Sequence, residues 1–171
     1  MVRTVIRDMV PSDGNRVVSI YGEGIATGQA TFQDEPGTWV SWDEGHMREC
    51  RMVATINEEV VGWAGLSNVS NRCVYRGIAE VSVYIADSVK GKGIGKALME
   101  TLIEASEEAN IWTLQASIFE ENQASIKLHK YFGFRKVGVR ERIGKMTFGP
   151  NASEWRDTTI MERRSKVVGV D

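Results

Sequence analysis

The pattern of hydrophobic and polar residues predicts strands along the whole chain. Between residues 78 and 86, Val81, Val83 and Ile85 alternate with Ser82 and Tyr84, which is the period of a strand whose two faces differ. The other segments with strand-like alternation or composition are 4–7, 52–56, 60–66, 112–118, 134–140 and 155–162. The chain is therefore expected to supply about seven strands to one sheet.

Segments with helical spacing separate these strands. The clearest is 93–109, where Leu98, Leu102, Ala105 and Ala109 fall on a single helix face. A helix-start signal at residues 11–13 predicts a helix before residue 22, and 39–47 and 122–132 predict two more. Residues 22–37 and 67–75 are typical of irregular loops. This order of elements predicts a mixed α/β sheet covered by helices on both faces, in a single domain over residues 1–171.

Composition and charge narrow the function classes. The net charge is −2, so no overall attraction to nucleic acid or to an anionic membrane is expected. No apolar run reaches the length of a membrane span, and the first residues lack the apolar core of a signal peptide. Cys50 and Cys73 have neither metal-ligand nor redox spacing, so we expect reduced thiols, no metal site and a cytoplasmic protein.

The 78–86 strand and the 93–109 helix are joined by a glycine-rich turn. Its sequence is Lys90-Gly91-Lys92-Gly93-Ile94-Gly95-Lys96. Glycines leave backbone amides open to an anion, and a helix N-terminus adds partial positive charge. The P-loop pattern fails because Ala97 follows Lys96, and the dinucleotide pattern fails because Lys96 occupies its third glycine position. The turn is a candidate pyrophosphate site, with a flexible turn carrying solvated lysines as the alternative.

A second candidate site lies on the 122–132 helix. Asn122, Ser125 and His129 share one face because of their spacing. We expect the opposite face to pack through Ala124, Leu128 and Phe132. The polar face is then free to contact a ligand, although Asn122 alone is also typical of a helix N-cap.

Together, the two motifs resemble the cofactor signatures of the GNAT superfamily of N-acetyltransferases. The strand 81–85 followed by Lys90-x-x-Gly93-x-Gly95 is similar to the first signature, in which Gln or Arg is usual where Lys90 stands. Asn122-x-x-Ser125-x-x-Leu128-His129-x-x-x-Gly133-Phe134 is similar to the second. Residues 24–32, 72–75, 79–84, 111–116, 155–157 and 162–165 further resemble the branch that acetylates phosphinothricin and methionine sulfoximine. The resemblance covers nearly the whole chain.

The resemblance implies a mostly antiparallel central sheet in which one central pair of strands splays apart. Acetyl-CoA would be the co-substrate, with its pantetheine arm along a strand of that pair and its pyrophosphate on the glycine-rich turn. The residues that the resemblance assigns to acetyl-CoA are Val83, Tyr84, Ile85, Lys90, Gly91, Lys92, Gly93, Ile94, Gly95, Lys96, Asn122 and Ser125.

The resemblance also assigns catalytic roles. An α-amine must lose a proton before it attacks a thioester, and Glu80 is similar to the glutamate that accepts this proton in the branch. An ion pair with Arg76 or Arg72 is the alternative role for Glu80. Many relatives carry Tyr where His129 stands, to protonate the leaving thiolate. His129 is therefore either a substitute acid or a structural histidine.

For the acceptor, Arg72 is the expected carboxylate ligand, because a guanidinium binds a carboxylate through two hydrogen bonds. An exposed loop arginine is the alternative. Phe32, Cys73 and Val74 are expected to line the pocket with Arg72 and Glu80. His46 is expected on a helix surface.

These observations predict an enzyme that acetylates the α-amine of phosphinothricin, methionine sulfoximine, methionine sulfone or a related amino acid by direct attack on the thioester. Two alternatives remain: the acceptor is a protein or peptide amine, or the chain is a non-catalytic acyl-CoA sensor. Members of the branch are homodimers, so a homodimer is expected. No nucleic-acid or membrane partner is expected.

Overall fold

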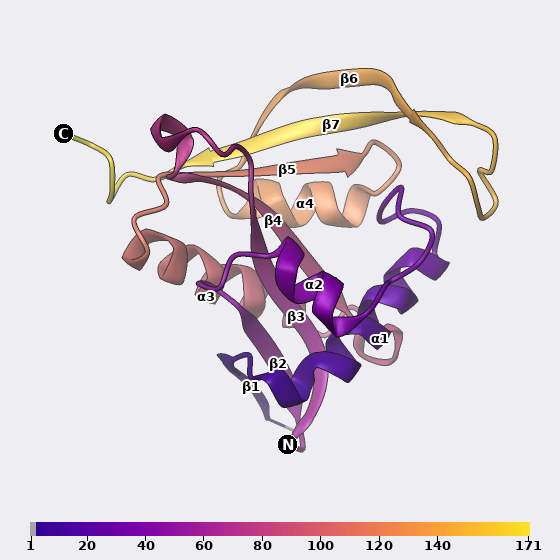
Figure 1. Cartoon of the computed structure of the whole chain (residues 1–171), viewed down its shortest axis with the longest axis horizontal. Coiled ribbons are helices and arrows are strands. Elements are labelled where there is room, and N and C mark those ends of the chain that lie inside the picture. Colours follow the sequence, from indigo (N-terminus) through magenta and orange to yellow (C-terminus); the bar gives the residue numbers. More distant parts are fainter. Residues whose placement is uncertain (1–2) are drawn as a thin grey trace.

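The computed structural model describes residues 3–171, which form one seven-stranded sheet with four α-helices (Figure 1). In chain order the elements are β1 (Thr4–Asp8), α1 (Gly14–Ala26), α2 (Trp39–Gly45), β2 (Met52–Ile56), β3 (Glu59–Asn68), β4 (Ile78–Ile85), α3 (Ile94–Glu108), β5 (Thr113–Phe119), α4 (Gln123–Tyr131), β6 (Arg135–Lys145) and β7 (Trp155–Arg164). The strand order is β1-β2-β3-β4-β5-β7-β6. Every pair is antiparallel except β4–β5, which confirms the expected mixed and mostly antiparallel sheet.

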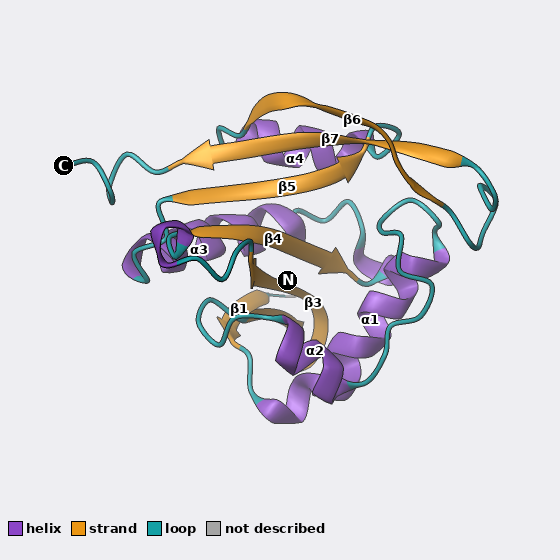
Figure 2. Ribbon diagram, turned by 45° about the horizontal axis from the view of Figure 1, so that its top comes forward, coloured by secondary structure: helices purple, strands orange, loops and turns teal. Residues whose placement is uncertain are grey.

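Helices cover both faces of the sheet, as expected (Figures 1 and 2). On one face, Tyr21 of α1 packs edge-on against Tyr84 of β4, with ring centroids 5.0 Å apart. On the other face, Leu98 of α3 approaches β3 at Gly62. Successive strand residues point to opposite faces, so alternate residues of β3 and β4 contact different helices. The core therefore has two layers, one on each side of the sheet.

The central parallel pair of strands is joined only at its beginning. Ile78, Ala79 and Glu80 of β4 pair with residues 113–115 of β5, and no further rung follows between them in the described chain. Beyond Glu80, β4 stays paired with β3, and β5 stays paired with β7. The expected splay of a central strand pair is confirmed, and it leaves backbone groups of β4 and β5 facing a gap.

Two elements are longer than expected. Helix α1 continues to Ala26, into the segment expected to be an irregular loop, because Ile20 and Ile25 are buried. Gly24 helps, since a Cβ there would stand 2.6 Å from the ring of Tyr84. Strand β6 continues to Lys145 because its pairing with β7 resumes after an irregularity between Arg140 and Gly144. Local residue preferences missed both extensions, which depend on contacts with distant residues.

Helix α4 packs through Leu128 and Phe132 as expected, but it also buries part of the face that was expected to be polar. Ile126 and His129 are buried, whereas Ala124 is exposed. The reason is the position of Ile126, which lies four residues after Asn122 and three before His129, and therefore on the polar face. Its large apolar side chain belongs to the main core and draws that face inward.

Cys50 and Cys73 are free thiols. Within residues 3–171, no helix has the combination of length and apolar character that crossing a bilayer requires. The same part of the chain holds no group of three or more His, Cys, Asp or Glu side chains placed to bind a metal ion.

Candidate active site

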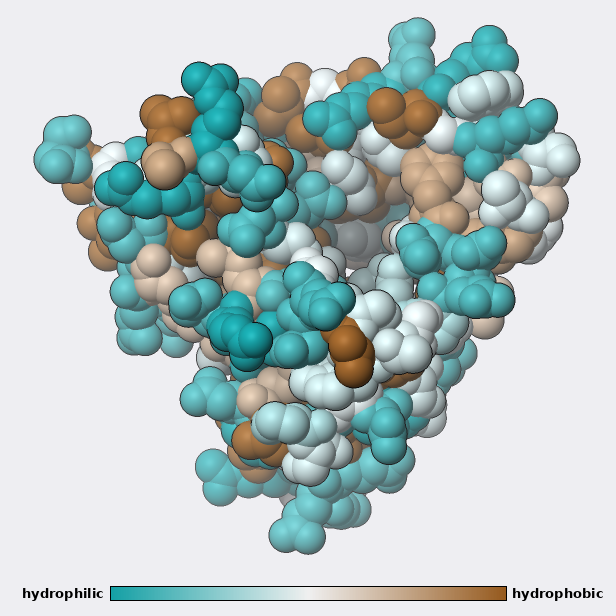
Figure 3. All heavy atoms as spheres, viewed as in Figure 1, coloured by the Kyte–Doolittle hydropathy of each residue, from teal (hydrophilic) through white to brown (hydrophobic). Residues whose placement is uncertain are grey.

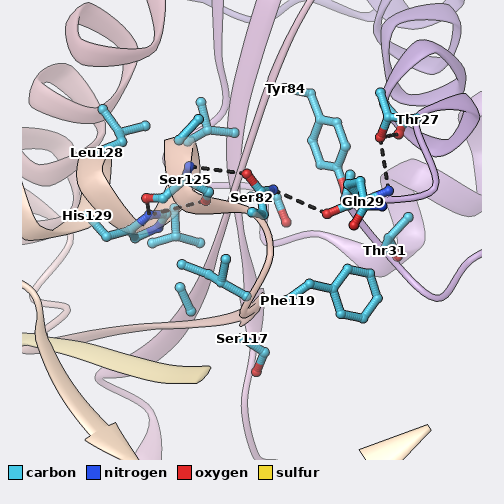
Figure 4. A pocket seen from close by; sticks show the side chains of 18 of the residues that line it. Thr27, Gln29, Thr31, Ser82, Tyr84, Ser117, Phe119, Ser125, Leu128 and His129 are labelled. Carbon is cyan, nitrogen blue, oxygen red and sulfur yellow. Dashed lines mark hydrogen bonds between the residues drawn. The ribbon is translucent and has the colours of Figure 1, made fainter. Parts of the chain in front are cut away.

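The gap between β4 and β5 opens into a cleft of about 800 Å³. Ser82 and Tyr84 line it from β4, and Ser117 and Phe119 line it from β5 (Figure 4). In the space-filling view, the surface is hollowed between the β6–β7 hairpin and helices α1 and α2 (Figure 3). The cleft thus lies where one strand pair stops exchanging hydrogen bonds, and its walls come from both halves of the sheet.

One end of the cleft is the glycine-rich turn before α3. Gly91 and Gly93 have φ angles of 77° and 81°, and a Cβ on either would meet no atom within 4 Å. The first hydrogen bond of the helix runs from the Ala97 N–H to the Gly93 carbonyl. The amides before Ala97 therefore lack an intrahelical acceptor, and the turn offers an open set of N–H donors. These features fit a pyrophosphate group.

The three lysines of this turn have separate contacts. Lys90 lines the cleft and forms an ion pair with Asp87. The ammonium of Lys92 lies 3.5 Å from the carbonyl oxygen of Ser88, and that of Lys96 lies 3.9 Å from the centre of the Tyr131 ring. Lys90 is the lysine that the structure brings closest to the gap between the strands, since the lining includes it and neither of the other two.

Asn122 and Ser125 line the cleft from the N-terminus of α4. The Asn122 side-chain oxygen accepts a hydrogen bond from the Ser125 N–H over 3.2 Å, which makes Asn122 the N-cap. Its amide nitrogen donates to the Gln29 carbonyl over 3.2 Å. Both residues line the cleft, although both ends of the Asn122 side chain already have protein partners.

Glu80 lies at the last paired rung of β4 and lines the cleft. The Gln115 amide nitrogen donates to its carboxylate over 3.1 Å. The alternative ion pair with Arg72 or Arg76 does not form in the described part of the chain. A carboxylate is thus held at the point where the two strands separate.

These features fit a carboxylate and an anion-binding turn at the two ends of one cleft, and comparison with known proteins decides the family. The sequence profile described as the acetyltransferase (GNAT) family matches residues 19–134, more than half of the chain. The chain belongs to the acetyltransferase (GNAT) family.

Named relatives of this acetyltransferase act on small amino-acid analogues. The chain is 32% identical to a phosphinothricin N-acetyltransferase of Alcaligenes faecalis, over 95% of this chain and 81% of that protein. It is 29% identical to an L-methionine sulfoximine/L-methionine sulfone acetyltransferase of Pseudomonas aeruginosa, over 92% of each. A solved structure of a phosphinothricin acetyltransferase from Sinorhizobium meliloti in complex with acetyl-CoA has 28% identity and a TM-score of 0.85, covering 98% of this chain and 91% of that one.

His129 of the acetyltransferase lines the cleft from α4, but its ring is buried. Its Nδ1 lies 2.7 Å from the Ser125 carbonyl oxygen (Figure 4). The ring also packs edge-on against Phe134. Burial lowers the pKa of His129, although the bond to Ser125 opposes this. Because a carbonyl only accepts, the neutral ring carries its proton on Nδ1. Nε2, fully buried and without a partner among residues 3–171, then offers a lone pair and no proton.

The side of the cleft next to α1 is aromatic and carries hydroxyl groups. Trp63 and Tyr84 stack with centroids 4.9 Å apart, and Tyr21 packs edge-on against both. Burial raises the pKa of Tyr21 and of Tyr84, so both hydroxyls stay protonated at neutral pH. Thr31 and Phe32 complete this side, and Phe32 packs edge-on against the Phe119 ring at 4.8 Å.

The structure does not bring the three other expected acceptor ligands into this cleft. Arg72, Cys73 and Val74 lie on an exposed loop before β4, outside the lining residues, and the Arg72 guanidinium lies 5.5 Å from the centre of the Tyr75 ring. An arginine that does line the cleft is Arg140 of β6. Only the register of β6 with β7 brings it there, which no local motif indicates.

His46 is the second residue that the sequence analysis missed, because the expectation of a helix-surface position for it is wrong. Its ring stacks on Trp42, with centroids 3.9 Å apart, and lines the cleft. The signal in the sequence was the four-residue spacing from Trp42, which places both rings on one side of a short helix.

The loop that carries Thr31 and Phe32 is held in place by a buried arginine. Arg156 of β7 donates to the Gly28 carbonyl and to the Gln29 side-chain oxygen, each over 2.6 Å. Gln29 also receives the Asn122 amide at its own carbonyl. The loop after α1 is thus tied to β7 and to the start of α4, so this wall of the cleft is built by three elements distant in sequence.

Proposed function

We propose that this chain transfers an acetyl group from acetyl-CoA to the α-amine of phosphinothricin, methionine sulfoximine, methionine sulfone or a related amino acid. The observation that carries the proposal is the Glu80 carboxylate, held by Gln115 where β4 and β5 separate. The named relatives support the acceptor class. The proposal covers residues 1–171 as one acetyltransferase domain.

Acetyl-CoA supplies an acetyl thioester that a neutral amine attacks. The amides of residues 91–96 bind the pyrophosphate, and the backbone of Val83 to Ile85, which lacks a partner on the β5 side, binds the pantetheine arm. Ser125 and Asn122 contact the same arm from α4. This arrangement leaves the reactive end of the cofactor beside Glu80.

Glu80 accepts a proton from the acceptor's ammonium group in this proposal. An α-amine is mostly protonated near neutral pH, so it has no lone pair for attack until a base takes its proton. The Gln115 hydrogen bond occupies one carboxylate oxygen. His129 has a positioning role for α4, because in its neutral form the ring has no proton on Nε2.

The acceptor's side chain lies against the aromatic wall. Its tetrahedral centre with two oxygen or nitrogen substituents needs hydrogen-bond donors, which the Tyr21, Thr31 and Tyr84 hydroxyls supply. For the α-carboxylate there are two candidates: Arg72, by resemblance, and Arg140, which lines the cleft in this protomer.

An acceptor screen tests the proposal. The purified chain is mixed with acetyl-CoA and each of phosphinothricin, methionine sulfoximine, methionine sulfone, unmodified amino acids and a peptide with a free N-terminus, and the free thiol is followed. Turnover with the analogues supports the proposal, whereas turnover with the peptide alone supports a protein acceptor. Binding of acetyl-CoA without any turnover supports a sensor and contradicts the proposal.

We propose that the enzyme is a cytoplasmic homodimer. The free thiols Cys50 and Cys73 suit a reducing compartment. Strand β6 ends the sheet, and apolar side chains stand exposed along β6, at the start of β7 and on the 72–75 loop: Val137, Ile143, Trp155 and Val74. An exposed apolar edge of this kind is suited to an interface with a second copy. Sedimentation at micromolar concentration tests it, and a monomer would contradict it.

A further inference from the structure

The two histidines of the chain, His46 and His129, both line the cleft but expose different atoms. Nδ1 of each ring lies 2.7 Å from the carbonyl oxygen four residues earlier, Trp42 for one and Ser125 for the other. Each neutral ring therefore holds its proton on Nδ1 and a lone pair on Nε2. Over residues 3–171, Nε2 of His129 is fully buried, whereas Nε2 of His46 has no partner and is not among the fully buried atoms.

The His46 ring is held over the face of β3 and β4 that carries Glu80. Its ring stacks on Trp42 at an interplanar angle of 12°, and it meets the Trp63 ring edge-on at 5.7 Å. The Met47 N–H donates to the Leu66 carbonyl over 2.8 Å, which ties the end of α2 to β3. The ring therefore has little freedom to turn away from the sheet.

The edge of the ring that carries Nε2 faces the residue pairs of β3 and β4 next to Glu80. Its Cδ2 atom, which adjoins Nε2, lies 3.4 Å from where a Cβ on Gly65 would stand. Gly65 pairs with Ser82, and Ser67 pairs with Glu80, so these positions share one face of β3 and β4. The Nε2 edge of His46 thus lies over the Gly65–Ser82 pair, two residues along β4 from Glu80 and on the same face of the sheet.

We propose that Nε2 of His46 accepts a proton from the acceptor's nitrogen, as a second base beside Glu80. The idea rests on the proposed function. Acetyl transfer to an ammonium removes two protons from nitrogen as the N–C bond forms and the C–S bond breaks. Glu80 takes the first proton, which frees the lone pair, and His46 takes the second once nitrogen is bonded to carbon. One of the two protons then passes to the sulfur of coenzyme A and the other to water.

The surroundings of His46 keep its ring neutral. Burial lowers its pKa most, and the Arg51 guanidinium, which donates to the His46 carbonyl over 2.9 Å, lowers it further, while the bond to Trp42 opposes both. Asp43 is ion-paired with Arg51, which offsets part of that positive charge. On the sheet side, the ionisable groups on the same face are Glu80, Tyr21 and Tyr84, and burial raises the pKa of both tyrosines. The ring is therefore ready to accept a proton at neutral pH.

Two substitutions separate a base from a packing ring. His46→Phe keeps an aromatic ring against Trp42 but has no lone pair, and His46→Ala leaves a space that added imidazole can fill. Val40→Ala, at an exposed position of the same helix, is the matched control. For the acceptor, kcat/KM should fall by about 10²-fold or more in both His46 variants. The acid limb of the pH profile of kcat/KM should be altered in both variants, and the KM for acetyl-CoA should stay unchanged. Added imidazole should partly restore the activity of His46→Ala.

Retained kcat/KM within twofold in His46→Phe, with an unaltered acid limb, would overturn the proposal. If the variants do not fold, modification of the histidines of the wild-type protein with diethyl pyrocarbonate tests the proposal instead. The reagent should modify His46 and spare the sealed His129, the acceptor should slow the reaction, and activity should fall in step with modification of His46. Activity that survives full modification of His46 overturns the idea. Wild-type protein that acetylates no amino acid instead contradicts the proposed function.

Discussion

The amide nitrogen of Gln115 donates to a carboxylate oxygen of Glu80 across the last rung that joins β4 to β5, over 3.1 Å. The β4–β5 pair therefore ends its hydrogen-bond ladder and holds a carboxylate at the same place, at the start of the gap. The hydrogen bond comes from a neutral amide, so the carboxylate is oriented without being paired to a positive charge.

Replacement of Glu80 by Gln should remove the proton acceptor while keeping the shape of the strand. We expect kcat to fall by about 10²–10⁴-fold, which is the usual contribution of a positioned base. The dissociation constant for acetyl-CoA, measured by calorimetry, should stay within twofold, because the pyrophosphate turn is untouched. Glu104→Gln, at an exposed position of α3, is the control for loss of a negative charge. Turnover of Glu80→Gln at the wild-type rate would show that Glu80 is not a base.

Substitution of Gly93 by Ala should weaken acetyl-CoA binding. Gly93 has a φ of 81°, so a side chain there costs about 1–2 kcal/mol and puts a methyl group among the free amides. Gly133→Ala is a matched control, since Gly133 has a φ of 82° with equally open space and lies at the end of α4. Both variants should lose similar stability in urea, but only Gly93→Ala should lose tenfold or more in affinity for coenzyme A. Equal affinities of the two variants for coenzyme A would contradict the proposal that the glycine-rich turn binds the pyrophosphate.

The features that the sequence analysis predicted well are those with local causes. The glycine-rich turn follows a strand of clear period and precedes a helix of clear period, so its place at a helix N-terminus needs no distant contact. Asn122 is likewise an N-cap because of its neighbours along the chain.

The missed features depend on pairings between distant segments. Arg140 reaches the cleft because it pairs with Thr158 of β7, and Gln115 meets Glu80 because two strands 35 residues apart run parallel. His46 was expected on a surface because the sequence pattern of a seven-residue helix says little about which residues cover it. In the structure, the Trp63 ring of β3 packs against it. Packing decided these positions, and helix periodicity did not.

Two arginines compete for the acceptor's carboxylate, and paired variants separate them. If Arg140 is the ligand, Arg140→Gln should raise the acceptor KM by about 10–100-fold, the value of a hydrogen-bonded charge, with little change in kcat. Arg72→Gln should then leave KM near the wild-type value, because Arg72 lies outside the cleft of this chain. The reverse result would assign the carboxylate to Arg72, and would support the proposed homodimer, in which the 72–75 loop of one copy could reach the cleft of the other.

The buried histidines should make the fold less stable in mild acid. The pKa of His129 and that of His46 are both lowered in the folded protein, chiefly by burial, whereas in the unfolded chain they return to about 6.5. Between the folded and unfolded pKa values the unfolded chain binds more protons, so the free energy of unfolding rises with pH in that window. The stability that the neutral histidines contribute is therefore fully present above about pH 6.5, and it is lost as the pH falls below that value.

His129→Asn tests this relation, because asparagine can still donate to the Ser125 carbonyl but takes up no proton. Urea unfolding at several pH values between 7.5 and 5 should show a smaller loss of stability in the variant than in the wild-type protein. Asp13 does not interfere, since Arg7 lowers the pKa of its carboxyl and its contribution changes only at more acidic pH. Parallel stability curves for the two proteins would mean that His129 is protonated as readily in the folded chain as in the unfolded one, which its buried Nε2 argues against.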